Sequence, residues 1–226
     1  MRRDVATLLA ASALYGFSIG YVHSTRFGLH NLIKFPLLFL ITGIACAVAY
    51  HLWALLVGGA RFRFVDVQRL AMRLYRDAAL LLAALAPANW FLARTLAPPD
   101  GVSLHEYPMF LGLNVGFIAF AGTLALVRQV RALARFHPWP LSRRLITVGG
   151  WLALSLLVGG QAAWTLRPFF GVRSIPGEKT RFFLGSAPDY RGSTNFYEAV
   201  RDVITRPTLA PDYIQRGTGY DAAPFN

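Results

Sequence analysis

Few residues in this sequence could carry chemistry, and the clearest candidate is a serine between two glycines. The segment Gly16–Gly20 (GFSIG) matches the G-x-S-x-G pattern of serine hydrolases, whose serine is a nucleophile at a strained turn between a strand and a helix. Here the pattern lies in a long apolar run with no acid–base partner nearby, which argues against a nucleophile. The segment also reads as G-x-x-x-G, as does Gly112–Gly116 (GLNVG), and this spacing lets helix backbones approach closely. We therefore predict that these glycines pack helices: Gly16, Gly20, Gly112 and Gly116.

The cysteine and histidine content does not predict a metal or haem site. Cys46 is the only cysteine, so an internal disulfide or a thiolate pair is impossible. His51 is the one histidine deep in an apolar stretch, whereas bis-histidine haem ligation needs a second at matching depth on a facing helix. The zinc-protease motif H-E-x-x-H is absent from the sequence. We therefore predict that the protein is not an enzyme and holds no cofactor and no metal.

The elements that must position these residues are five stretches without Asp, Glu, Lys or Arg. They cover residues 5–25, 35–58, 78–93, 107–127 and 145–166. A helix of about 20 residues crosses a hydrocarbon core of about 30 Å, and in lipid every backbone group must be paired within the segment. The sequence predicts an all-α, polytopic transmembrane helix bundle over residues 1–166 with about five spans. The first stretch has an alternative interpretation as a cleaved signal peptide.

The arginines predict the orientation. Loops 59–77 and 128–144 carry five arginines each, whereas loop 94–106 carries one. The positive-inside rule then places those two loops and the N-terminus in the cytoplasm, and the tail, 167–226, on the periplasmic or extracellular side of a bacterial cytoplasmic membrane. Although the formal net charge is +12, this placement argues against a nucleic-acid partner. We expect lipid-headgroup contacts, with an acidic cytoplasmic partner as the alternative, from Arg69, Arg73, Arg76, Arg128, Arg131 and Arg135.

Polar side chains deep in the predicted spans are uncharged. Ion-coupled transporters usually carry ionisable residues at depth, so their absence argues against a proton- or sodium-driven pump. We expect Asn89, Asn114 and Gln161 to form hydrogen bonds across helices. The alternative is that these three residues line the path of a passive pore.

The tail is rich in proline, glycine and aromatic residues. Asn195 is predicted to cap a short helix over Phe196–Thr205, with Glu198 at the capping-box position. Aromatic side chains carry large apolar area and are favoured at contacts. We therefore expect the tail either to lie on its own helices or to wrap a partner.

The sequence at the junction between the last span and the tail resembles a known signature. Gln161–Gly171 (QAAWTLRPFFG) resembles a Gln-x-x-Trp-x-Leu-Arg-Pro-Phe-x-Gly signature of small polytopic bacterial membrane proteins of unassigned activity. Ile33–Leu40 resembles the entry to their second helix, and Asn195–Val200 a motif near their C-terminus, whereas His51 and Trp53 depart from the pattern. The resemblance implies a shared helical bundle with a shaped exit from the last helix, and no reaction. The predicted partner or interface contacts are Gln161, Trp164, Arg167, Phe169, Phe170, Asn195, Phe196 and Tyr197.

These observations lead to two hypotheses of function. The first is a non-catalytic structural or accessory subunit of a larger membrane protein complex, whose partners are the lipid bilayer and other membrane protein subunits. The second is a small transporter or channel component. The sequence names neither the partner subunit nor the solute.

Overall fold

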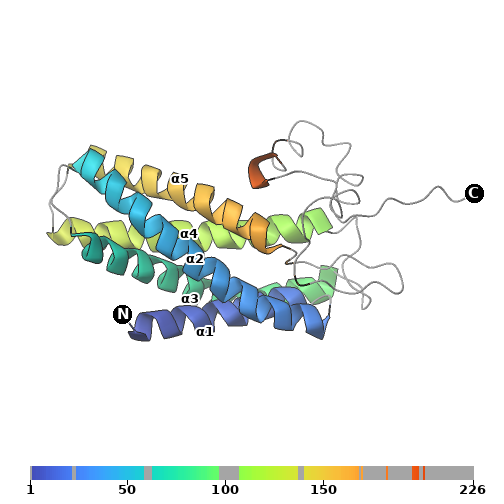
Figure 1. The fold of residues 1–226 in the computed structure, drawn as a ribbon. Coiled ribbons are helices and arrows are strands. Elements are labelled where there is room, and N and C mark those ends of the chain that lie inside the picture. Colours follow the sequence, from blue (N-terminus) through green and yellow to red (C-terminus); the bar gives the residue numbers. More distant parts are fainter. Residues whose placement is uncertain are drawn as a thin grey trace, which may run out of the picture.

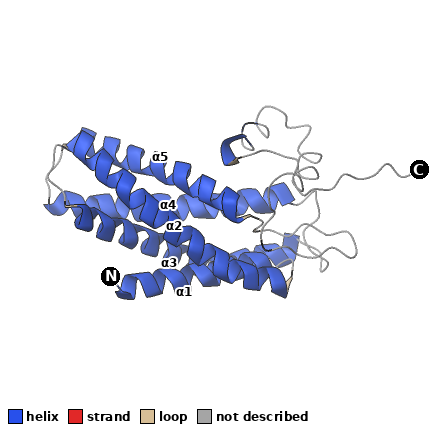
Figure 2. Cartoon of the chain, in the orientation of Figure 1, coloured by secondary structure: helices blue, strands red, loops and turns tan. Residues whose placement is uncertain are grey.

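The chain folds as a bundle of five long helices that run alternately in opposite directions (Figure 1). They are α1 (Arg2–Tyr21), α2 (Thr25–Gly58), α3 (Phe64–Leu96), α4 (Tyr107–Phe136) and α5 (Leu141–Leu166). The structure, a computed structural model, describes residues 2–21, 24–58, 63–96, 107–136, 140–167, 169, 182, 195–198 and 201. Within these ranges the chain is helical and contains no strand, as Figure 2 shows. The prediction of an all-α bundle is confirmed for this part of the chain.

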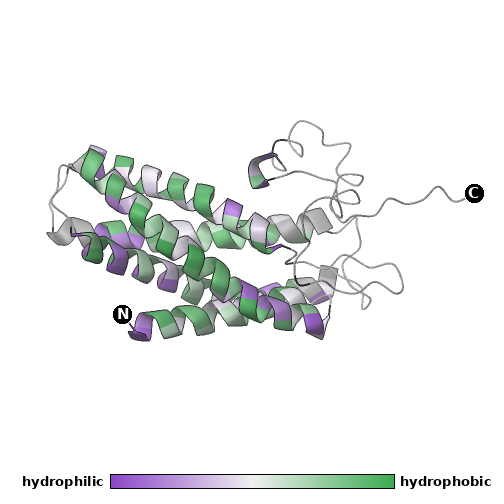
Figure 3. Ribbon diagram, viewed as in Figure 1, coloured by the Kyte–Doolittle hydropathy of each residue, from purple (hydrophilic) through white to green (hydrophobic). Residues whose placement is uncertain are grey.

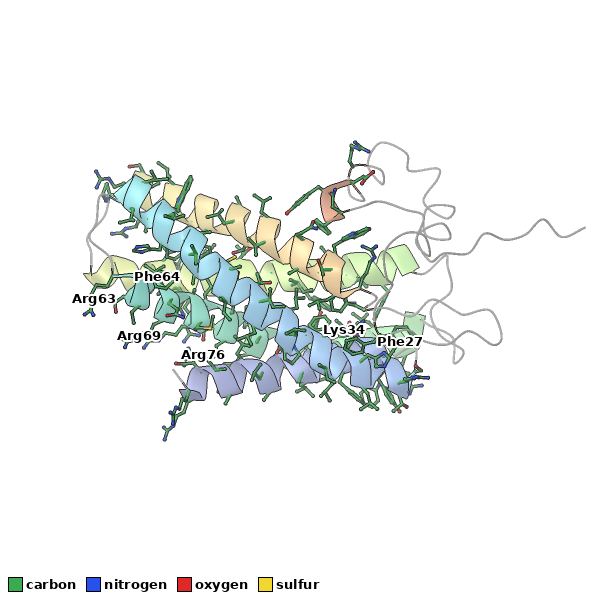
Figure 4. The ribbon with its side chains drawn as sticks, in the orientation of Figure 1. Phe27, Lys34, Arg63, Phe64, Arg69 and Arg76 are labelled. Atoms are coloured by element: carbon green, nitrogen blue, oxygen red, sulfur yellow. The ribbon has the colours of Figure 1, made fainter. Side chains whose placement is uncertain are left out.

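The two ends of the bundle differ. The start of α1, the end of α2 and the start of α3 lie at one end, which we call the arginine end because Arg63 and Arg69 lie there (Figures 1 and 4). The end of α1, the start of α2 and the end of α5 lie at the opposite end, from which the chain continues into residues 167–226. We call this the tail end.

Three of the helices are long and apolar enough to cross a membrane. Their apolar segments are Thr25–Val57 of α2, Gly112–Ala132 of α4 and Leu141–Leu166 of α5. The remaining two predicted spans, 5–25 and 78–93, fall on α1 and α3, which are not among the three. Apolar residues run along the helices (Figure 3), and many large apolar side chains are exposed, among them Leu56, Phe91 and Phe120, as expected for helices that face hydrocarbon.

The second helix begins ten residues before the predicted span at 35–58. Ser24 caps it, because its Oγ accepts the backbone N–H of Phe27 at 3.2 Å. The predicted first loop around Arg26 and Lys34 is therefore helical. Lys34 lies inside the apolar segment of α2 and is fully buried, whereas the prediction placed it in the loop just before the span. A charge ended the predicted span, whereas the helix continues because the bundle covers that charge.

Close backbone contact joins α1 to α2. A Cβ built on Gly16 would lie 2.5 Å from the carbonyl oxygen of Asn31, and one on Gly20 would lie 2.4 Å from that of Phe27. Only glycine fits at such distances, which is the packing expected of the G-x-x-x-G spacing. The first helix also packs along α3. Thus α1 is seated on the bundle through its backbone.

Side chains join α2 to α5 over several turns. The rings of Tyr50 and Trp151 stack with centroids 4.6 Å apart. Trp53 lies over Gly150, where a Cβ would be 2.2 Å from the indole ring. These contacts bury large aromatic side chains in the interior and stabilise the bundle through their apolar area. Helix α4 lies between α3 and α5 and contacts both.

Candidate functional site

Ser18 of the G-x-S-x-G segment belongs to a hydrogen-bonded layer that joins α1 to α3. Its Oγ donates to the carbonyl of Tyr15 at 2.7 Å and accepts the Nδ2 amide of Asn89 at 3.2 Å. One turn away, the hydroxyl of Tyr15 donates to Oδ1 of Asn114 on α4 at 2.9 Å. Ser18 has no histidine or carboxylate among these partners. It is therefore a packing residue.

Asn89 and Asn114 belong to this hydrogen-bonded layer, whereas Gln161 does not. Both asparagines are buried, and each bonds to α1. The side chain of Gln161 is exposed on α5. The expected hydrogen bonding across helices is thus seen for Asn89 and Asn114.

A second polar layer lies between α2, α3 and α5. The hydroxyl of Tyr50 is hydrogen-bonded to Oγ of Ser155, and the hydroxyl of Tyr75 lies 3.4 Å from each of them. The thiol of Cys46 faces the carbonyl of Leu154 at 3.8 Å. From the sequence, the arginine spacing over 64–76 predicts a helix in the headgroup region with Tyr75 among its apolar residues. In the structure this segment is the start of α3, and Tyr75 is buried in the bundle.

A carboxylate cluster lies toward the arginine end. Nε and Nη2 of Arg76 donate to Oδ1 of Asp77 at 2.9 and 2.6 Å, and Nε2 of Gln129 on α4 donates to Oδ2 at 2.7 Å. Arg76 also pairs with Asp4 of α1. Its guanidinium holds the pKa of the Asp4 carboxyl below its usual value through this hydrogen bond. The cluster therefore joins α1, α3 and α4 by charge-assisted contacts.

The arginines predicted to contact lipid headgroups fall into two groups. Arg69, Arg73, Arg128 and Arg131 are exposed, as a headgroup contact requires. Arg76 pairs with Asp4 and Asp77 and is only partly exposed (Figure 4 labels Arg69 and Arg76). The side chain of Arg135 lies outside the described residues.

The glycine pair on α4 lies open. A Cβ built on Gly112 or Gly116 would meet no atom within 4 Å in the described part of the chain. Both residues are exposed, whereas Asn114 between them is buried. The expected packing of this pair is therefore not found with another described helix of this chain.

Lys34 and its neighbours form the least ordinary site in the structure. Its Nζ lies 4.8 Å from the ring centroid of Phe182 and 5.8 Å from that of Phe169. Nδ2 of Asn31, one turn earlier on α2, donates to the carbonyl of Phe169 at 2.6 Å. The imidazole of His30 meets the ring of Phe182 edge-on at 5.0 Å. The site thus combines a buried cation from α2 with two rings that follow α5 in the chain.

The exit from α5 folds back on its own last turn. The guanidinium of Arg167 lies 3.6 Å from the ring centroid of Trp164, and its Nη1 donates to the Trp164 carbonyl at 3.3 Å. A cation over an aromatic face and a donor on a late carbonyl both stabilise a helix C-terminus. Phe169, two residues after Arg167, packs edge-on against Phe35 with ring centroids 5.2 Å apart. Phe170 lies outside the described residues.

The predicted cap in the tail is present, and its neighbours lie on α5. The backbone N–H of Glu198 donates to Oδ1 of Asn195 at 2.9 Å. The ring of Phe196 lies against Gly160, where a Cβ would be 2.7 Å from it, and the hydroxyl of Tyr197 donates to the carbonyl of Leu157. These described tail residues therefore contact the bundle of their own chain.

This arrangement offers structural contacts and one buried amine. Among the described residues, no group of three or more histidine, cysteine or acidic side chains is placed to hold a metal ion. No protein-family model, curated protein or solved structure matches the chain. Any functional assignment therefore depends on the geometry of this chain.

Proposed function

We propose that the protein is a non-catalytic integral membrane subunit, a structural or accessory component of a larger membrane protein complex. The observation that supports this proposal most directly is that buried hydroxyl and amide side chains form hydrogen bonds between helices. Ser18, Asn89 and Asn114 are the groups that a hydrolase or a polar path would need, and their contacts join α1 to α3 and α4. In lipid such bonds contribute about 0.6–2 kcal/mol each to helix association. We therefore propose that these residues stabilise the helix bundle as a structural scaffold.

We further propose five spans in a bacterial cytoplasmic membrane, with the arginine end in the cytoplasm. Helices α1 and α3 would cross together with α2, α4 and α5, because α1 is seated on α2 through Gly16 and Gly20. The arginine excess in loops 59–77 and 128–144 supports this orientation. The resemblance of Gln161–Gly171 to a family of bacterial membrane proteins supports the same compartment.

The open glycine pair on α4 is the proposed contact for a neighbouring subunit. Small residues on an exposed helix face allow a second helix to approach closely. A Cβ added at Gly112 or Gly116 would meet no described atom within 4 Å, and exposed apolar side chains flank them, among them Val115 and Phe120. A helix of a partner subunit could pack there without any rearrangement of α4.

Purification in mild detergent tests this proposal. The wild-type protein should retain at least one membrane protein partner, and Gly116→Leu should lose it while its own folding is unchanged. Gly149→Leu is the matched control, because Gly149 is also an exposed helical glycine with no atom within 4 Å of an added Cβ. Loss of the partner in both variants, or in neither, would count against α4 as the contact surface.

A transporter or channel component is the second candidate, and the two buried ionisable side chains favour it. Lys34 and Asp77 are 0% and 5% exposed, and ionisable residues inside a membrane protein commonly mark a transport path. Solute flux through the lone protein in liposomes would support this candidate. Flux that requires a co-purified partner, or no flux, supports the accessory subunit.

A further inference from the structure

Each end of the bundle holds a buried charge. At the arginine end, the carboxylate of Asp77 accepts hydrogen bonds from Arg76 and Gln129. At the tail end, Lys34 lies between aromatic rings. Placing a cation away from water is unfavourable unless other groups replace its hydration. Aromatic faces do so in part, because their negative face attracts an ammonium group.

Both of those rings come from the chain that follows α5. Phe169 is held in place twice, since its carbonyl accepts Nδ2 of Asn31 at 2.6 Å and its ring packs against Phe35. Phe182 lies between two residues of α2, with its ring 4.8 Å from Nζ of Lys34 and 5.0 Å from the imidazole of His30. Four side chains on successive turns of α2 thus face the same segment of the tail.

We propose that the first turns of α2 form a docking site for aromatic side chains, that Lys34 is its central group, and that its occupant is the chain's own tail through Phe169 and Phe182. The docked rings contribute to the burial of the Lys34 side chain. The tail is therefore fixed to the bundle at two places, on α2 through Phe182 and on α5 through Phe196 and Tyr197.

The composition of the chain makes this site easy to monitor. Of its 23 basic residues only two are lysines, Lys34 and Lys179, and the rest are arginines. An amine-acylating reagent therefore modifies two lysine side chains and the N-terminal amine, which mass spectrometry resolves one by one. The modification rate of Lys34 reports how often the aromatic rings leave it.

The experiment is acetylation of the purified full-length protein with an N-hydroxysuccinimide ester in mild detergent. We expect Phe182→Ala to raise the modification rate of Lys34 by about tenfold, because the ring that covers the amine is lost. The rate at the N-terminal amine, at the opposite end of the bundle, serves as the internal reference. Phe120→Ala is the matched control, since Phe120 is a phenylalanine 61% exposed on α4, and it should leave Lys34 unchanged. An unchanged rate at Lys34 in Phe182→Ala would overturn the proposal.

Substitution of the lysine provides an independent test. Lys34→Met keeps an unbranched side chain of similar volume in the bundle and removes the charge, whereas Lys34→Arg keeps a cation that stacks on rings. We expect limited chymotrypsin digestion to remove the tail several-fold faster in Lys34→Met than in wild type, with Lys34→Arg in between and Arg73→Met unchanged. Equal cleavage of Lys34→Met and wild type would show that Lys34 does not hold the tail. Both tests use the protein alone, so their outcome is independent of any partner.

Discussion

Replacement of Arg76 by Met removes the central donor of the carboxylate cluster, and its effect on stability can be estimated from the contacts. Asp77 is 5% exposed and accepts two hydrogen bonds from Arg76, at 2.9 and 2.6 Å. Removal of one partner from a buried ion pair typically costs about 3–5 kcal/mol. The Arg76 side chain is 26% exposed, Gln129 still donates to Asp77, and Nε of Arg128 lies 3.9 Å from Oδ2 of Asp77, so solvent and these remaining partners reduce the loss. We expect a decrease of about 2–3 kcal/mol in the free energy of unfolding.

The assay is equilibrium unfolding of the purified protein in mixed micelles with increasing denaturing detergent, followed by tryptophan fluorescence. Arg73→Met is the matched control, because Arg73 lies one turn away on the exposed side of α3, and its effect should stay within about 0.5 kcal/mol. A further variant, Arg76→Met with Asp77→Leu, removes both charges and should recover part of the stability, since a buried pair can be replaced by apolar residues at little cost. If Arg76→Met and Arg73→Met unfolded alike, the cluster would be only a surface contact and the reasoning would be refuted.

Three further predictions address acid stability, packing and topology. Because the Arg76 guanidinium holds the pKa of Asp4 below its usual value, this pair should stabilise the fold at pH above about 4 and lose its effect as the pH falls further; unfolding midpoints at pH 3 and pH 6 should converge in Asp4→Asn. Gly20→Leu should reduce the yield of folded protein in detergent, since an added Cβ would lie 2.4 Å from the Phe27 carbonyl oxygen, whereas Gly149→Leu should behave as wild type in size-exclusion chromatography. Single cysteines in the tail and in loop 128–144 should show opposite accessibility to an impermeant thiol reagent in intact cells, and equal labelling would contradict the proposed orientation.

The helices themselves follow from elementary features of the sequence. Long runs without charge predict helices in lipid, and the structure places α2, α4 and α5 on three of them. The start of α2 at Thr25 could not be predicted from the sequence, because the charge of Lys34 set the boundary of the predicted span at residue 35. That assumption fails where the bundle covers a cation. The aromatic rings next to Lys34 belong to Phe169 and Phe182, which are far from Lys34 in sequence. A local sequence pattern cannot predict such a contact.

The two glycine pairs illustrate what spacing can and cannot predict. Both read as G-x-x-x-G, and both form a small ridge on a helix. Gly16 and Gly20 meet the backbone of α2, whereas Gly112 and Gly116 meet no described atom within 4 Å. The G-x-x-x-G spacing indicates that another helix can approach closely. Which helix does so depends on how the rest of the bundle packs.

The arginines of α3 show the same limit. Arg73 and Arg76 lie about one turn apart in the same series of arginines, so the sequence predicts the same lipid-headgroup contact for both. In the structure Arg73 is exposed and Arg76 reaches Asp4, 72 residues away in the chain. The difference arises because α1 packs along the side of α3 that carries Arg76.

A common logic links the two buried charged sites to the proposed scaffold role. The carboxylate cluster ties α1 to α3 and α4 at the arginine end, and Lys34 ties α2 to the chain after α5 at the tail end. Each site joins segments that the apolar packing alone would not fix in register, because lipid tails are as apolar as the helices and provide no hydrophobic drive between them. Polar contacts of defined geometry therefore determine which helices meet. A transport path would need such groups to change partners during a cycle, whereas a scaffold needs them to keep the same partners, and the contacts of Asp77 from two helices at once favour the scaffold.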